Sequence, residues 1–334
     1  MPRMTTHRLF LPLVLVCAAA GSVGLLAQSA PRAARRVAPA RAAAARAAEV
    51  PALIEGPTVD KDGNVYFTEL RAQKIYKLGT DGELTAFREK SHAANGLVID
   101  PEQRLIACEG AADGEQPRIT RTDLKSGAVE VLADGYQGAP FKGPNDVTID
   151  KSGRIYFTDT AGGAVYRIDA PGRIARVLAA PDVERPNGLQ IAPDDRTLYI
   201  IESGAAPSNP RMIRAFDLSA DGVASRGRTF YDFPGRSADG MSVDVQGNLY
   251  VSAGLNRLAP PGAVAAARAW TAAALKTRAG VYVISPAGKL LRFIPIDEDV
   301  ITNNAFGGPD MKTLYVTSGR TLFRIQNDIA GLPR

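Results

Sequence analysis

The feature that most constrains this chain is a short β-rich run that recurs six times. Each run mixes β-branched and aromatic residues and follows a turn, which is the pattern of a strand that begins after a tight turn. The central residues of successive runs are 40, 50, 43, 51 and 65 residues apart. The runs are NVYFTE (64–69), RLIACE (104–109), RIYFTD (154–159), TLYIIE (197–202), NLYVSA (248–253) and TLYVTS (313–318).

A second β-like run follows each of these, so a repeat contains three or four strands. A repeat of about 40 to 50 residues with this content is typical of a propeller blade. The sequence therefore predicts an all-β fold, a six-bladed β-propeller over residues 50–334. The longest interval holds an Ala-rich stretch that predicts a helical insertion around 258–279. The last repeat lacks an outer strand, and we expect residues 50–56 (VPALIEG) to supply it and close the ring.

The N-terminus has the features of an export signal. Basic residues precede an uncharged, apolar stretch between Leu9 and Pro31, followed by small residues. Residues 1–30 are therefore predicted to be a signal peptide, and the protein is expected to be secreted or periplasmic. The alternative is an uncleaved membrane anchor, because the apolar stretch is just long enough to span a bilayer. Residues 31–49, rich in Ala, Arg and Pro, are predicted to be a flexible linker.

Charge and cysteine content exclude several classes of function. The chain has a net charge of +5, but its first 50 residues contain seven arginines and one acid, so the rest is close to neutral. A nucleic-acid partner is therefore not expected, and neither is a membrane beyond the signal peptide. After the signal, Cys108 is the one remaining cysteine, which rules out an internal disulfide and a cysteine-based zinc site. We expect a monomer.

Every repeat offers an acid or an amide at one matched position. Counting back eleven residues from the centre of each run, or twelve in the fourth repeat, reaches these side chains, which would converge on the axis of a propeller. Six oxygen-bearing side chains around one axis suit Ca²⁺, which takes six to eight oxygen ligands, and none is a His or Cys that would favour zinc. The alternative is a ring of ordinary turn formers, since Asn and Asp favour turns. The six residues are Glu55, Asn95, Asn145, Asn187, Asp239 and Asn304.

The stretches around these residues resemble the senescence-marker-protein/gluconolactonase-like family, which includes regucalcin. The resemblance spans residues 55–325, nearly the whole chain after the predicted linker. It implies a six-bladed propeller with one divalent cation, expected to be Ca²⁺, in the central tunnel, and hydrolysis of sugar lactones or related esters. The stretches include EGPTVDKDGNVYFTE, ANGLVIDPEQRLIACE, GPNDVTIDKSGRIYFTD, RPNGLQIAPDDRTLYIIES and ADGMSVDVQGNLYVSA.

The resemblance also implies roles for residues. Glu55, Asn187 and Asp239 match the metal ligands of the family, and Asn145 matches a ligand or a substrate contact. Asn95 and Asn304 would line the same mouth as substrate contacts.

The sequence departs from the family at the substrate side of the site. Val59 stands where the family often has Trp, and Ala93 where it commonly has Arg. The substrate loop is shortened to TDTAGG (158–163), and with the missing arginine this predicts a more open or differently shaped pocket. His92, three residues before Asn95, is a candidate substrate contact and proton shuttle, or else an exposed loop histidine.

Together these observations predict a calcium-dependent hydrolase that opens sugar or related lactones. The cation would polarise the lactone carbonyl. Since Ca²⁺ acidifies water weakly, Asp239 is predicted to act as general base, with Glu55 chiefly a ligand. The alternative is a non-catalytic sugar- or protein-binding propeller with a structural calcium, because propellers host many functions.

Overall fold

The computed structural model describes residues 43–112, 114–204, 211–256 and 272–333. The predicted signal peptide, most of the predicted linker and residues 257–271 of the predicted insertion lie outside these residues. In the described part of the chain, no helix has the length and hydrophobicity needed to cross a membrane.

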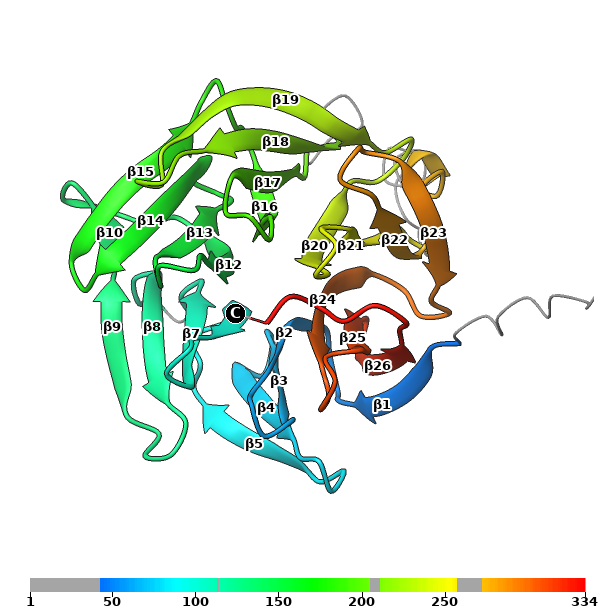
Figure 1. The fold of residues 1–334 in the computed structure, drawn as a ribbon. Helices are drawn as coiled ribbons and strands as arrows, with labels where there is room; N and C mark the ends of the chain where they lie inside the picture. The colour runs from blue at the N-terminus through cyan, green and yellow to red at the C-terminus, as the bar shows by residue number, and fades with distance from the viewer. Residues whose placement is uncertain (1–42, 113, 205–210, 257–271, 334) are drawn as a thin grey trace, which may run out of the picture. The chain divides into compact units, whose positions relative to one another are not determined.

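Six four-stranded antiparallel sheets surround a central axis, so the prediction of a six-bladed β-propeller is confirmed (Figure 1). In five blades four consecutive strands run from the axis outward. The strands of the first three blades are β2 (Ile54–Val59), β3 (Val65–Glu69), β4 (Lys74–Leu78) and β5 (Leu84–Glu89); β6 (Ala94–Ile99), β7 (Arg104–Glu109), β8 (Arg118–Asp123) and β9 (Val129–Ala133); and β12 (Pro144–Ile149), β13 (Ile155–Asp159), β14 (Ala164–Ala170) and β15 (Arg173–Ala179).

The remaining blades follow the same plan, with a small two-stranded sheet between the second and third blades. That sheet pairs β10 (Gly135–Tyr136) with β11 (Ala139–Pro140). The last three blades are β16 (Pro186–Ile191), β17 (Thr197–Glu202), β18 (Met212–Leu218) and β19 (Ala224–Asp232); β20 (Ala238–Val243), β21 (Leu249–Ala253), β22 (Gly280–Ile284) and β23 (Leu290–Pro295); and β24 (Ile301–Gly307), β25 (Thr313–Ser318), β26 (Thr321–Gln326) and β1 (Ala45–Glu49).

The strand that closes the ring lies earlier in the chain than predicted. β1, within the stretch predicted as a linker, pairs antiparallel with β26 and forms the outer strand of the sixth blade. The predicted closing segment, residues 50–56, instead turns inward, and its last residues begin the innermost strand of the first blade. The backbone amides of Val50 and Ile54 donate to carbonyls of the sixth blade at 3.0 and 2.9 Å. The chain therefore joins its first and last blades over about ten residues.

Aspartates cap the turns that connect the two inner strands of a blade. In the first blade, Asp60 accepts hydrogen bonds from the amides of Asp62 and Asn64 and from the hydroxyl of Tyr66. Asp150 repeats this pattern in the third blade. Asp side chains stabilise such turns by bonding the backbone two residues ahead.

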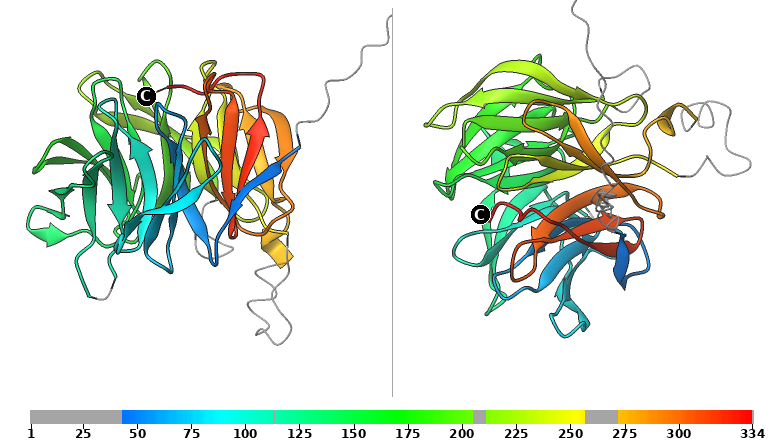
Figure 2. Two further views of the ribbon diagram at one scale, coloured as in Figure 1. Left: turned by 90° about the horizontal axis from the view of Figure 1, so that it is seen from below. Right: turned by 45° about the vertical axis from the view of Figure 1, so that its right-hand side comes forward.

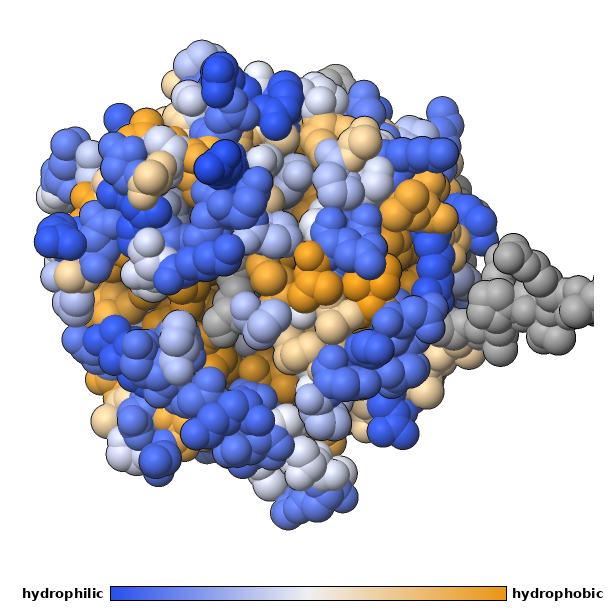
Figure 3. Space-filling model, in the orientation of Figure 1, coloured by the Kyte–Doolittle hydropathy of each residue, from blue (hydrophilic) through white to orange (hydrophobic). Residues whose placement is uncertain are grey.

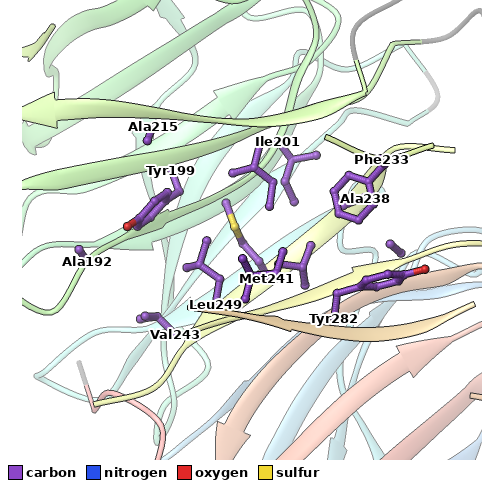
Figure 4. Packing of buried hydrophobic residues seen from close by; sticks show 14 residues of the cluster. Ala192, Tyr199, Ile201, Ala215, Phe233, Ala238, Met241, Val243, Leu249 and Tyr282 are labelled. Carbon is purple, nitrogen blue, oxygen red and sulfur yellow. The ribbon is translucent and has the colours of Figure 1, made fainter. Parts of the chain in front are cut away.

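Among the residues that the structure describes, the hydrophobic core consists of six clusters, one at each junction between neighbouring blades. At the junction of the fourth and fifth blades, Ile201 and Met241 pack between the facing sheets, with Tyr199 and Tyr282 at the edges (Figure 4). Because every inner strand is packed on both sides, residues at its ends are held in fixed positions around the axis.

The two ends of the propeller carry different connections. Figure 2 shows the C-terminal segment crossing one end, while the short helical turn of residues 272–274 lies at the other. That turn is the helical part of the predicted insertion among the residues that the structure describes. The amides of Gly331 and Leu332 donate to carbonyls of Met311 and Val243, which ties the sixth blade to the fifth.

Candidate functional site

The same β-bulge occurs in the inner strand of every blade. In the first blade the register shifts between Glu55 and Thr58, and in the fifth between Ala238 and Met241. A bulge adds one residue to a strand and re-aims side chains next to functional sites. Five predicted residues occupy the equivalent position in this bulge, at one end of the tunnel, and we call them the ring. They are Glu55, Asn95, Asn145, Asn187 and Asp239.

The sixth repeat does not place Asn304 in the ring. Ala305 pairs with Tyr315, and Ile301 pairs with Ser318, so Thr302 occupies the ring position. The β24–β25 hairpin is two residues longer than the hairpin of the first blade, because Ala305 pairs with Tyr315 ten residues later whereas Thr58 pairs with Tyr66 eight residues later, and this shifts the count. The buried amide of Asn304 donates to the Tyr250 carbonyl and the Ser252 hydroxyl at 2.9 and 2.8 Å. Asn304 therefore joins two blades, in contrast to its predicted place beside the other ring residues.

Asp239 is the best-connected member of the ring. The Asn187 amide nitrogen donates to its Oδ1 at 2.8 Å, and a guanidinium nitrogen of Arg236 lies 3.5 Å from its Oδ2. The Asp239 side chain is 16% exposed. Burial raises the pKa of Asp239 above its ordinary value, although Arg236 and Asn187 favour the charged form. The bond from Asn187 uses the amide nitrogen, which leaves the carbonyl oxygen of that amide for another partner.

Glu55 lies deeper and interacts electrostatically with the same acid. Burial raises its pKa well above the ordinary range, and the charges of Asp239 and Asp146 raise it further. The Gly56 amide, which donates to Glu55 Oε2 at 3.0 Å, and the charge of Arg236 act in the opposite direction. Glu55 and Asp239 are therefore two carboxylates that repel each other in a poorly solvated place, where a cation would stabilise both.

Two residues that were not predicted as site residues meet across the tunnel just behind the ring. The Asn303 amide donates to Asp146 Oδ2 at 3.1 Å, joining the sixth and third blades. Burial raises the pKa of Asp146 to about 7, although the Val147 amide and Asn303 favour its charged form. Four blades have glycine at this position, and a Cβ on Gly96 or Gly240 would lie within 3 Å of Asp146 or Asn303. The sequence signal was the acid after Asn145, where four other repeats have glycine.

The other predicted contacts have separate surroundings. His92 lies on the loop before β6, at the ring end, and its Nδ1 is 2.8 Å from Glu115 Oε2. His92 and Ala93 both have a φ of 53°, which few non-glycine residues adopt. The Asn95 backbone carbonyl accepts a bond from Thr68 at 3.0 Å. Asn145 lies beside Asp146 at the start of β12 and is partly exposed.

The ring fits a hard cation by its donor chemistry. Two carboxylates and amide oxygens are ligands that Ca²⁺ and Mg²⁺ prefer, and the ring contains no sulfur or imidazole. Within the described ranges, no three His, Cys, Asp or Glu side chains cluster in an arrangement ready for a metal. The electrostatics favour a cation, because burial raises the pKa of both Glu55 and Asp239 and the charge of Asp239 raises that of Glu55 further. Amide oxygens of neighbouring ring residues would complete a ligand set that contains two acids.

A cavity of about 260 Å³ occupies the other end of the tunnel. Figure 3 shows hydrophobic residues gathered around the hollow centre of this face. Its walls combine apolar residues with hydroxyl and amide groups, and the C-terminal segment borders it at Leu332. Asp146 and Asn303 line its inner end, so the ring and this cavity adjoin the same cross-tunnel hydrogen bond.

Comparisons with known proteins agree with this architecture. Residues 53–320 match a family described as the SMP-30/Gluconolactonase/LRE-like region. A gluconolactonase of Zymomonas mobilis is 26% identical over 314 residues, which cover 83% of this chain and 79% of the relative. The pentonolactonase XacC of Haloferax volcanii is 29% identical over 246 residues, or 71% of this chain and 64% of the relative.

Solved structures give the same result. A candidate gluconolactonase superposes with a TM-score of 0.73 at 25% identity, covering 89% of this chain and 96% of that protein. A gluconolactonase of Xanthomonas campestris superposes with a TM-score of 0.69 at 26% identity, covering 84% and 88%. A calcium-binding regucalcin of Agrobacterium tumefaciens, at 18% identity and a TM-score of 0.67, shares the fold; the alignment covers 87% of this chain and 96% of that protein.

Proposed function

The chain belongs to the SMP-30/gluconolactonase/LRE-like family, and from this premise we propose that it hydrolyses lactones at the ring with the help of a divalent cation. The observation that carries the proposal is the pair of poorly solvated carboxylates, Glu55 and Asp239, at one end of the tunnel, where the charge of Asp239 raises the pKa of Glu55. The lactonase activity of the relatives in Zymomonas and Haloferax supports the reaction class.

Glu55, Asp239 and the amide oxygens of Asn187 and Asn145 would hold the cation. When bound, such a cation supplies charge that polarises the lactone carbonyl and stabilises the oxyanion. A preference for Ca²⁺ follows from the oxygen-only donors and from the flexible geometry that this ion accepts.

Asp239 acts as general base in this mechanism. It is the more exposed of the two ring acids, so a water molecule reaches its carboxylate more readily than that of Glu55. Asp239 takes a proton from water as the water oxygen bonds to the lactone carbonyl carbon. The ring C–O bond then breaks, and the proton passes to the departing alkoxide, so the product is the open-chain hydroxy acid.

The substrate class we propose is a five- or six-carbon sugar lactone. The Zymomonas and Haloferax relatives are a gluconolactonase and a pentonolactonase. Ala93 stands where the resemblance leads one to expect arginine, so the binding of the sugar relies on other groups.

We also propose that the protein is exported. Its basic residues, apolar stretch and small residues at positions 1–30 have the order of a signal peptide. Expression of the full chain in a bacterium, followed by fractionation and N-terminal sequencing of the mature protein, tests this. Recovery of an uncleaved, membrane-bound chain would contradict it.

The decisive experiment is a lactone panel assayed with Ca²⁺, with Mg²⁺ and with a chelator. We expect turnover of aldonolactones that requires a divalent cation. Absence of turnover on every lactone and ester, together with a cation-dependent rise in melting temperature, would replace the enzyme with a calcium-stabilised binding propeller.

A further inference from the structure

Arg236 is a partly buried cation at the ring whose guanidinium has few bonds to the protein. Its side chain is 23% exposed. Within the described residues, the guanidinium makes one ion pair, in which Nη2 lies 3.5 Å from Asp239 Oδ2. Other partly buried arginines bond carboxylates closely, as Arg118 does with Glu109 at 2.7 Å and Arg154 with Asp150 at 2.6 Å. Charge-assisted hydrogen bonds fall near 2.7–2.9 Å, so most of the Arg236 donors are left for another partner.

The backbone of Arg236 is fixed from outside the ring. Its amide donates to the Ala274 carbonyl at 3.1 Å, and the Gly235 amide donates to the Thr277 hydroxyl at 2.9 Å. A Cβ on Gly235 would lie 2.5 Å from the Ala274 oxygen, so glycine is required for this close approach. The last part of the insertion therefore holds the backbone of Arg236 at the edge of the ring, which lowers the entropy lost when it binds a ligand.

The charge balance of the ring leaves Arg236 without a counterion of its own. The two negative charges of Glu55 and Asp239 together balance the charge of a divalent cation. The positive charge of Arg236 also lowers the pKa of both acids. With the cation of the proposed function in place, the positive charge of Arg236 is in excess. A partly desolvated guanidinium with free donors favours an anionic ligand.

We propose that Arg236 binds a carboxylate of the ligand, so that the site prefers sugar lactones that carry a carboxylate besides the ring ester. This inference rests on the proposed function. Guanidinium and carboxylate pair through two parallel hydrogen bonds, which fixes the orientation of the ligand as well as its charge. The carboxylate has two possible sources, a substituent of the substrate or the acid formed by ring opening.

Kinetics distinguish the two sources. Glucono-1,5-lactone is neutral and glucaro-1,4-lactone carries a carboxylate, and both are assayed with the wild type, Arg236→Gln and Arg236→Lys. We expect Arg236→Gln to raise KM for the charged lactone by about 10- to 100-fold, the usual cost of a hydrogen bond to a charged group, and to leave KM for the neutral one within about twofold. Arg236→Lys should restore part of the loss. An equal effect of Arg236→Gln on both lactones would overturn the substrate preference.

Calorimetry tests the inference without turnover. Glucarate, gluconate and sorbitol are titrated into calcium-loaded wild type and Arg236→Gln, with Arg228→Gln as the matched control. Arg228 pairs with Asp217 at 2.7 Å on the outer strands, so this control removes an equal charge far from the ring. We expect Arg236→Gln to weaken glucarate binding at least tenfold, to leave sorbitol unchanged, and to tighten Ca²⁺ binding severalfold because a competing charge is gone.

The outcomes separate this inference from the proposed function. Carboxylate binding that depends on Arg236, with no lactone turnover, would contradict the lactonase proposal and support the carboxylate site. Turnover with carboxylate affinities identical in Arg236→Gln and wild type would sink the carboxylate site and retain the lactonase. Weaker gluconate binding with an unchanged KM ratio for the two lactones would assign Arg236 to the product alone and overturn the substrate preference.

Discussion

The two ends of the central tunnel are built from the same six inner strands but differ in how their polar groups are satisfied. At the ring, Glu55 and Asp239 are buried close together with raised pKa values and one loosely paired arginine. At the C-terminal end, polar side chains bond to each other, as when Thr148 donates to Gln190 at 2.9 Å. Groups held in an unfavourable electrostatic arrangement mark a functional site better than a cavity does.

Local backbone structure explains the difference between the two ends. Each inner strand begins at the ring with a bulge, which re-aims one polar side chain. Each runs toward the other end into a hairpin, and the turns that Asp60 and Asp244 cap keep those carboxylates fully bonded.

The largest expected effect comes from Asp239→Asn at the ring. The substitution keeps an oxygen ligand but removes a charge and the proposed base. Cation affinity should fall, and activity at saturating Ca²⁺ should still be reduced about 10²- to 10⁴-fold, the usual contribution of a general base. Steady-state kinetics across a calcium titration measure both quantities.

Asn187→Ala is the control for that variant. It removes a neutral oxygen and the bond to Asp239 Oδ1 but no base. Its defect should be recovered largely by excess Ca²⁺. If saturating Ca²⁺ instead restores full activity to Asp239→Asn, Asp239 is only a ligand, and Glu55 or His92 becomes the candidate base.

The next largest effect is expected from loss of β1, which should destabilise the ring and the cavity end of the tunnel equally. Removing residues 1–50 deletes the strand that pairs with β26 and opens the sixth blade. We expect the free energy of unfolding to fall by roughly 3 kcal/mol or more, by the usual scale of a lost core element. Removing residues 1–42 is the matched control and should leave stability unchanged. Equal urea midpoints for the two truncations would show that β1 does not close the ring.

The number of blades and five of the six ring positions were predictable, because both follow from spacing along the chain. The sixth position was not, since the longer β24–β25 hairpin places Thr302 at the equivalent position and Asn304 between two blades. The closing strand was missed because the sequence of β1, ARAAE, lacks β-branched and aromatic residues. Its strand conformation comes from pairing with β26, a tertiary effect that overrides local propensity.

The contacts of Arg236 and Asp146 could not be read from the sequence either. Arg236 reaches the ring because its loop is bonded to Ala274 and Thr277, about 40 residues further along the chain. Asp146 meets Asn303 across the tunnel from the opposite side of the propeller. Both contacts depend on how the closed ring brings distant blades together, which spacing within one repeat does not encode.

A smaller effect is expected on the pH dependence of stability, which involves Asp146, the acid that lies between the ring and the cavity. The pKa of Asp146 is about 7 in the folded protein, against an ordinary value of 3.8. Between these values the folded protein holds a proton that the unfolded chain has lost. Stability of the metal-free protein should therefore fall as pH rises through this window, by up to about 1.4 kcal/mol per pH unit for one proton.

Asp146→Asn tests this dependence. The variant removes the titrating group and keeps a side chain that can accept the Val147 amide. Urea unfolding in a chelator from pH 4.5 to 8 should show a flatter profile for the variant than for the wild type. Parallel profiles would mean that Asp146 titrates at its ordinary pKa, as an acid in contact with solvent would.

The smallest effect at the ring is expected from the C-terminal segment. Ending the chain after Asp328 removes three backbone hydrogen bonds, from Gly331, Leu332 and Val245, and uncovers the cavity. Each bond contributes about 0.5–1.5 kcal/mol net, so the melting temperature should drop measurably. The kcat/KM for a lactone should stay within about twofold, because the ring residues lie beyond the Asp146–Asn303 bond. A tenfold loss would show that this bond transmits changes between the ends, and Asn303→Ala should then reproduce the loss in the full-length chain.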